Sequence, residues 1–167
     1  GNEPVVIEEL MNDIDYYPDQ YLNRLAHQGV NGLLLSLSGY NDEGERVGFG
    51  DLVSTSITPN EGVNGEKRLK KLRSVVEKCL NYGIKTYLFT IEPYVNLKKD
   101  SPIFDTYSES EIIGNSGARN LCASTEPGQT YLYEATNKIF TAIPELGGLI
   151  NISHGERGTT CLSAVSA

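Results

Sequence analysis

The segment from Asn151 to Glu156 contains the residues whose types and spacing are most suggestive of chemistry. A short apolar run stops at polar residues, and His154 and Glu156 follow it two positions apart. In a parallel α/β barrel, chemistry is placed at the carboxyl ends of the strands. A carboxyl group at the mouth of an apolar barrel has its pKa raised, which suits a general acid. The alternative is an ion pair of Glu156 with Arg157 or a lysine on a surface loop.

The elements that must position these groups follow one repeated pattern, in which an amphipathic helix, a stop residue and a short apolar strand succeed one another. We expect helices from Pro18 to about residue 28, from about Glu66 to Tyr82, and from Ser124 or Thr125 to about residue 143. Gly29, Gly83 and Pro144 are placed to end them. The strands that follow span 32–38, 85–91 and 148–152, and residues 4–9 form a further strand or an extended arm.

Alternation of helix and strand predicts a parallel sheet with right-handed crossovers. The two long loops, 39–65 and 92–123, both follow strands, which is where α/β proteins bind ligands. No glycine-rich phosphate loop follows the first strand, so a dinucleotide-binding sheet is disfavoured. Three or four strands do not close a barrel of eight. We therefore predict an α/β fold in which residues 1–167 are a single domain, a partial TIM barrel made of parallel (β/α) units.

Composition narrows the classes of partner. The 167 residues are 39% hydrophobic and 22% charged, which is typical of one folded domain. The net charge of −8 argues against nucleic acid and anionic membranes as partners, and no apolar run is long enough to span a bilayer. The chain begins at Gly1 instead of Met, which leaves the localisation unknown and is compatible with export after removal of a signal.

The cysteines and histidines give no pattern typical of a metal site. Three cysteines, an odd number, argue against a disulfide framework and against a zinc ribbon, and Cys79 lies on the apolar face of the second helix. His27 is far from His154 in sequence, and no paired Cys or His spacing occurs. We expect neither a metal nor a cofactor.

Three segments, taken in order, resemble the catalytic barrel of family 20 glycoside hydrolases, the β-N-acetylhexosaminidases. Residues 15–38 (DYYPDQYLNRLAHQGVNGLLLSLS) are similar to its opening helix, turn and strand. Residues 82–93 (YGIKTYLFTIEP) are similar to its next turn and strand, and residues 151–156 (NISHGE) to its His-x-Gly-Gly-Asp-Glu motif. The resemblance implies an O-glycosyl hydrolase with a TIM barrel, a carbohydrate substrate and Glu156 as the general acid.

The chain departs from that family pattern at three positions. Gly155 stands where the family has the Asp that orients the acetamido group of the substrate, Asn151 stands at its His, and His154 at a Gly. The resemblance thus indicates a sugar-processing barrel more firmly than any one sugar specificity.

Four further residues are candidates for substrate binding. Glu92 closes the second strand and has the chemistry to bind sugar hydroxyls, or to pair with Arg119 or a lysine. His154 would orient Glu156 or contact the sugar, or be an ordinary loop residue. Asn151 would point into the barrel mouth. Asp42, on the first long loop, would bind hydroxyls or lie solvated.

Three hypotheses remain open on the sequence. The first is a glycoside hydrolase of which this chain is the N-terminal half, inactive alone. The second is a non-catalytic carbohydrate-binding or scaffold domain on a degenerate barrel, favoured by Gly155. The third is a complete small α/β domain of another class. A half barrel exposes apolar sheet edges, which predicts self-association into a homo-oligomer.

Overall fold

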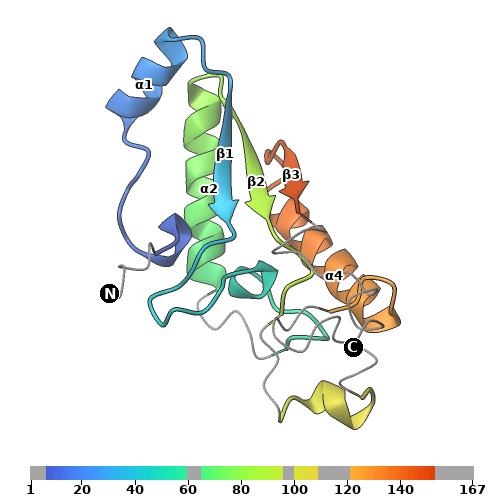
Figure 1. The fold of residues 1–167 in the computed structure, drawn as a ribbon. Helices are drawn as coiled ribbons and strands as arrows, with labels where there is room; N and C mark the ends of the chain where they lie inside the picture. The colour runs from blue at the N-terminus through green and yellow to red at the C-terminus, as the bar shows by residue number, and fades with distance from the viewer. Residues whose placement is uncertain (1–6, 60–64, 96–99, 109–120, 153–167) are drawn as a thin grey trace.

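The chain folds as an α/β unit with a parallel three-stranded sheet (Figure 1). The computed structural model describes residues 7–59, 65–95, 100–108 and 121–152. Its elements in chain order are η1 (Glu9–Met11), α1 (Asp19–His27), β1 (Gly32–Leu37), η2 (Phe49–Asp51), α2 (Gly65–Asn81), β2 (Lys85–Thr90), η3 (Pro102–Asp105), α4 (Glu126–Ala142) and β3 (Gly148–Asn151). The expected helices and strands are confirmed to within about two residues at each end.

The strands lie side by side in the order in which they occur along the chain. β2 pairs in parallel with β1 on one side and with β3 on the other. Leu37 is in register with Thr90, and Thr90 with Asn151. The carboxyl ends of all three strands therefore meet at one edge of the sheet, as the alternating sequence pattern predicts.

Local signals in the sequence set the helix boundaries. Gly29 and Gly83, which follow α1 and α2, have φ of +80° and +71°, a conformation in which side chains other than hydrogen are strained. Pro18 is the N-cap of α1. The Thr125 hydroxyl accepts a hydrogen bond from the Gly128 amide at the start of α4, which satisfies a donor that the helix leaves unpaired.

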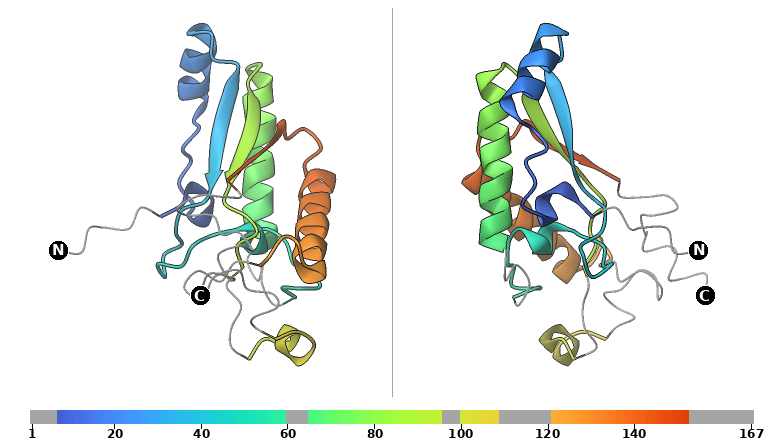
Figure 2. Two further views of the ribbon diagram at one scale, coloured as in Figure 1. Left: turned by 45° about the vertical axis from the view of Figure 1, so that its right-hand side comes forward. Right: turned by 90° about the vertical axis from the view of Figure 1, so that its left-hand side faces the viewer.

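One face of the sheet packs against the helical layer and forms the core. α2 and α4 lie on the same side of the sheet and contact each other (Figures 1 and 2). The strand side chains on that face are buried, among them Leu35, Leu37 and Leu88. They join helix residues into a single cluster that includes Leu22, Leu72, Val76, Cys79, Tyr131, Ala135 and Ile139. Burial of Cys79, which is a free thiol, confirms its expected core position and raises its pKa to about 11.

The other face of the sheet is not covered by a described helix (Figure 2). Leu34 of β1 is 52% exposed and Ile150 of β3 is 48% exposed, although both are strand residues. Tyr87 and Phe89 of β2 lie between them and are only partly buried. The sheet thus has an apolar face that the described residues leave open, whereas the near-continuous apolar strands predict burial on both faces.

The residues before α1 run along the sheet edge and along α2. Ile7 forms a parallel bridge with Tyr40, beyond the end of β1, and the Glu8 amide donates to the Tyr40 carbonyl at 2.8 Å. This placement agrees with the extended segment expected over residues 4–9, of which only the last three residues are described.

Cys122 is disulfide-bonded, so the argument from the odd cysteine count against disulfides is wrong for this residue.

Candidate functional site at the carboxyl edge of the sheet

The carboxyl edge brings Glu92 and Asn151 together, as the sequence predicts. Glu92 follows β2 by two residues and Asn151 ends β3. The Asn151 amide oxygen accepts hydrogen bonds from the Thr90 hydroxyl and the Glu92 amide, both at 2.8 Å. Its amide nitrogen donates to the Glu92 carbonyl at 3.0 Å. Asn151 therefore fixes the backbone that leaves β2.

The Glu92 side chain is buried and is held entirely by contacts within the protein. It is 3% exposed. The Phe49 amide donates to Oε1 and the Tyr94 amide donates to Oε2, both at 2.5 Å. The Tyr131 hydroxyl of α4 lies 3.1 Å from Oε1 and 3.0 Å from Oε2. One carboxyl group thus joins the loop after β1, the loop after β2 and the helical layer.

Burial dominates the protonation of Glu92. Loss of water raises its pKa to about 8, while the hydrogen bonds from Phe49, Tyr94 and Tyr131 act in the opposite direction. Desolvation prevails because these donors are neutral dipoles, which stabilise the charged form less than burial destabilises it, and the nearby charge of Asp51 raises the pKa further. A carboxyl with a pKa near neutrality is what a general acid requires, but this one points toward α4, on the covered side of the sheet.

A second buried carboxyl at this edge, Glu8, was missed by the sequence analysis. Glu8 is 7% exposed. Its Oε2 accepts from the Ser36 hydroxyl at 3.0 Å, the Ser38 amide at 3.2 Å and the Gly39 amide at 2.5 Å. Ser36 is on the face of β1 that the helices leave open, so Glu8 lies on the side opposite to Glu92. Its only sequence signal was its place in the expected N-terminal strand, where a charged residue is unusual.

Glycines allow both glutamates to approach the backbone closely. A Cβ added to Gly39 would lie 2.6 Å from Glu8 Oε2, and one added to Gly48 would lie 2.7 Å from Glu92 Oε1. Both distances are too short for a real carbon, so each carboxylate occupies the space that a side chain would take.

The remaining candidates from the sequence are placed as follows. Asp42 is exposed in a turn after β1, where the Asn41 side chain accepts from the amides of Glu43 and Glu45. His154 and Glu156 lie outside the described residues. The structure therefore brings together Glu92 and Asn151 and leaves Asp42 on the surface. The acid role expected for Glu156 stays a prediction.

An arginine completes the polar groups of this edge. Arg46 pairs with Tyr40 in an antiparallel bridge, just before the turn that reaches Glu92. Its guanidinium carbon is 5.6 Å from the centroids of both the Tyr40 and the Tyr94 rings. Its Nη1 is buried and has no hydrogen-bond partner within the described ranges. The cation was not singled out in the sequence because loop arginines are common and its two tyrosines are distant along the chain.

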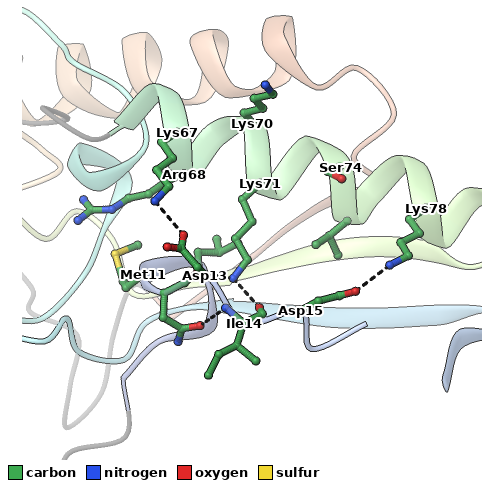
Figure 3. Close-up of a pocket in the computed structure, with 13 residues that line it drawn as sticks. Met11, Asp13, Ile14, Asp15, Lys67, Arg68, Lys70, Lys71, Ser74 and Lys78 are labelled. Carbon is green, nitrogen blue, oxygen red and sulfur yellow. Dashed lines mark hydrogen bonds and ion pairs between the residues drawn. The ribbon is translucent and has the colours of Figure 1, made fainter. Parts of the chain in front are cut away.

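A groove of about 520 Å³ lies between residues 10–15 and α2 (Figure 3). The Lys71 ammonium donates to the carbonyls of Glu9, Asn12 and Ile14, at 2.5, 2.7 and 3.0 Å. Ion pairs Lys67–Asp13 and Lys78–Asp15 cross the groove at 2.8 and 3.0 Å. Most of its cations are thus used to attach the N-terminal segment to α2, so the groove is a packing seam with an open mouth.

No protein-family model matches the chain, and no curated protein is significantly similar to it. Within the described ranges, no cluster of three or more His, Cys, Asp or Glu side chains is arranged to hold a metal ion. In the same ranges, no helix combines the length and the apolar character that crossing a membrane requires.

Proposed function

We propose that this chain forms the first (β/α) units of a barrel that hydrolyses O-glycosidic bonds, with Glu156 as the general acid. The observation that supports the barrel most directly is the combination of strand order and helix placement. In a doubly wound sheet the strand order reverses and helices cover both faces. In a barrel the strands follow one another in sequence and all helices lie outside. Here the order is β1-β2-β3, and α2 and α4 lie on one face.

The open face of the sheet has the composition that a barrel interior needs. Leu34, Tyr87, Phe89 and Ile150 present bulky apolar side chains from adjacent strands, in register. Such residues fill the interior layers of (β/α)8 barrels. We expect further β/α units to pair with the outer edges of β1 and β3 and to enclose this face.

The carboxyl edge supports a saccharide ligand. Ser36, on the face of β1 that a barrel would enclose, presents a hydroxyl near this edge, whereas the buried Glu8 and the backbone-bound Asn151 support the loops around it. Hydroxyl oxygens of this kind bind sugar hydroxyls. Glu156 follows Asn151 by five residues, and the resemblance of residues 151–156 to a hexosaminidase motif gives it the acid role. The buried position of Glu92 makes it a support for the loops instead of a sugar ligand.

Hydrolysis of aryl glycosides tests this function. We expect a polypeptide with the complete barrel to cleave 4-nitrophenyl glycosides and residues 1–167 alone to be inactive. Glu156→Gln should lower kcat by about 10² to 10⁴, the usual contribution of a general acid. The matched control is Glu145→Gln, because Glu145 is an exposed glutamate after α4. Full activity of Glu156→Gln would refute the acid role.

A non-catalytic carbohydrate-binding domain is the second candidate. Gly155, in place of the family's aspartate, favours it, because acetamido-assisted hydrolysis requires that carboxylate. Binding of an oligosaccharide to the complete barrel without turnover would decide for it.

A further inference from the structure

Arg46 is held at the carboxyl edge by contacts from two loops. It belongs to the loop after β1, and Tyr94, one of the two rings beside it, belongs to the loop after β2. Tyr94 is itself fixed, because its amide donates to Glu92 and its carbonyl accepts from the Tyr131 hydroxyl. The guanidinium is therefore oriented by the same network that holds the edge together.

The guanidinium lacks the partner that its chemistry requires. In the described part of the chain Arg46 makes no ion pair, whereas Arg68 and Arg73 both do. The faces of the guanidinium are attracted to aromatic rings, but rings do not accept the in-plane N–H bonds. Its buried Nη1 has no acceptor among the described residues. A buried donor without an acceptor is costly, and the best acceptor for an arginine fork is an oxyanion.

The two tyrosine rings beside Arg46 differ in how far they are exposed to solvent. Tyr40 is 40% exposed, whereas Tyr94 is more deeply buried. Tyr40 thus presents a partly exposed aromatic ring beside the guanidinium. An arginine donor next to an aromatic face suits a sugar ring that carries a negative group. The net charge of −8 means that the protein as a whole does not attract anions, so recognition must come from this local contact.

We infer that Arg46 binds an oxyanion carried by the saccharide, so that the site is selective for acidic sugars over neutral ones. This inference rests on the proposed function, because it names the class of sugar at the same edge. Carboxylate, sulfate ester and phosphate ester share the chemistry that Arg46 recognises. A comparison of the affinities of sugars that carry these three groups identifies which anion is bound.

Titration of the 167-residue chain with four sugars tests the inference. The probes are glucuronate, glucose 6-sulfate, glucose 6-phosphate and glucose, and binding is followed by amide chemical shifts. We expect at least one anionic sugar to bind about tenfold more tightly than glucose, a difference that corresponds to about 1.4 kcal/mol. Arg46→Gln should remove this preference. Arg73→Gln, on the exposed face of α2, should leave it unchanged.

Two further measurements keep the test decisive. If Arg46→Gln does not fold, Arg46→Lys keeps the charge but loses the planar fork, and should weaken the anionic sugar while glucose is unaffected. Equal affinity for glucose and all three anionic sugars would overturn the inference alone. Binding of inorganic sulfate at Arg46 with no preference for any anionic sugar over glucose would overturn the inference, whereas a complete barrel that neither binds nor cleaves a glycoside would overturn the proposed function.

Discussion

Replacement of Glu92 by glutamine should change how the stability of the protein depends on pH. The wild-type carboxyl is buried at the junction of two loops and α4, and its pKa is raised to about 8. In the unfolded chain the same group has a pKa near 4.5. Between these two values the folded protein keeps a proton that the unfolded chain has lost.

The sign of the effect follows from this difference in bound protons. Stability falls with rising pH wherever the folded state binds more protons than the unfolded state. The contribution of Glu92 to the free energy of unfolding is therefore most favourable below about pH 4.5. It decreases progressively as the pH rises to about 8. Each pH unit in that window corresponds to about 1.36 kcal/mol, so the full loss is at most about 5 kcal/mol.

Urea unfolding monitored by circular dichroism at pH 5, 6, 7 and 8 measures this loss. We expect the free energy of unfolding of the wild type to fall across the series and that of Glu92→Gln to be flatter. The variant should be less stable than the wild type at pH 5 by about 1–3 kcal/mol, because its NH2 group faces a backbone donor. Glu77→Gln, at an exposed site on α2, is the control and should leave the slope unchanged.

A second variant tests the same cause from the opposite direction. Tyr131→Phe removes a donor that lowers the pKa of Glu92 and retains the ring that packs in the core. The pH window should then extend further upward. A wild-type stability that is constant or increases from pH 5 to 8, or an equal slope in Glu92→Gln, would refute the reasoning.

Three other changes test the packing. Gly48→Ala should destabilise the fold by about 1–3 kcal/mol in urea unfolding, because its Cβ would lie 2.7 Å from Glu92 Oε1. Lys71→Met should lower the free energy of unfolding by about 1–3 kcal/mol and speed amide hydrogen exchange in residues 9–15, because the carbonyls of Glu9, Asn12 and Ile14 lose their donor. Leu35→Ala should cost about 2–5 kcal/mol, whereas Leu34→Ala, on the open face of the same strand, should cost far less.

Each of these has its own control or contrary result. Gly32→Ala should be nearly neutral, because its nearest neighbour would lie 3.6 Å away, and a cost equal to that of Gly48→Ala would exclude the steric explanation. Lys70→Met, at an exposed position on α2, should leave exchange unchanged. An equal cost for Leu34→Ala and Leu35→Ala would mean that the sheet face at Leu34 is covered.

At the carboxyl edge, the sequence predicted which residues meet but not how their side chains bind one another. Strand-end position predicted that Glu92 and Asn151 would meet, because parallel strands end at one edge. It did not predict that Asn151 would bind the backbone of Glu92, nor that the Glu92 side chain would turn toward Tyr131. Those contacts join residues 39–59 positions apart, and no local pattern encodes them.

The sequence by itself determined the elements and their order. Apolar periodicity fixed the helices, and glycines at Gly29 and Gly83 fixed where two of them end, because both signals act within a few residues. Only the tertiary structure decided which face of the sheet is covered and that Glu8 and Glu92 are buried on opposite sides. It also decided that Arg46 lies beside two tyrosines, with a buried Nη1 that has no acceptor in the described part of the chain. Burial and desolvation depend on neighbours brought together from distant parts of the chain, and such neighbours exist only once the sheet has formed.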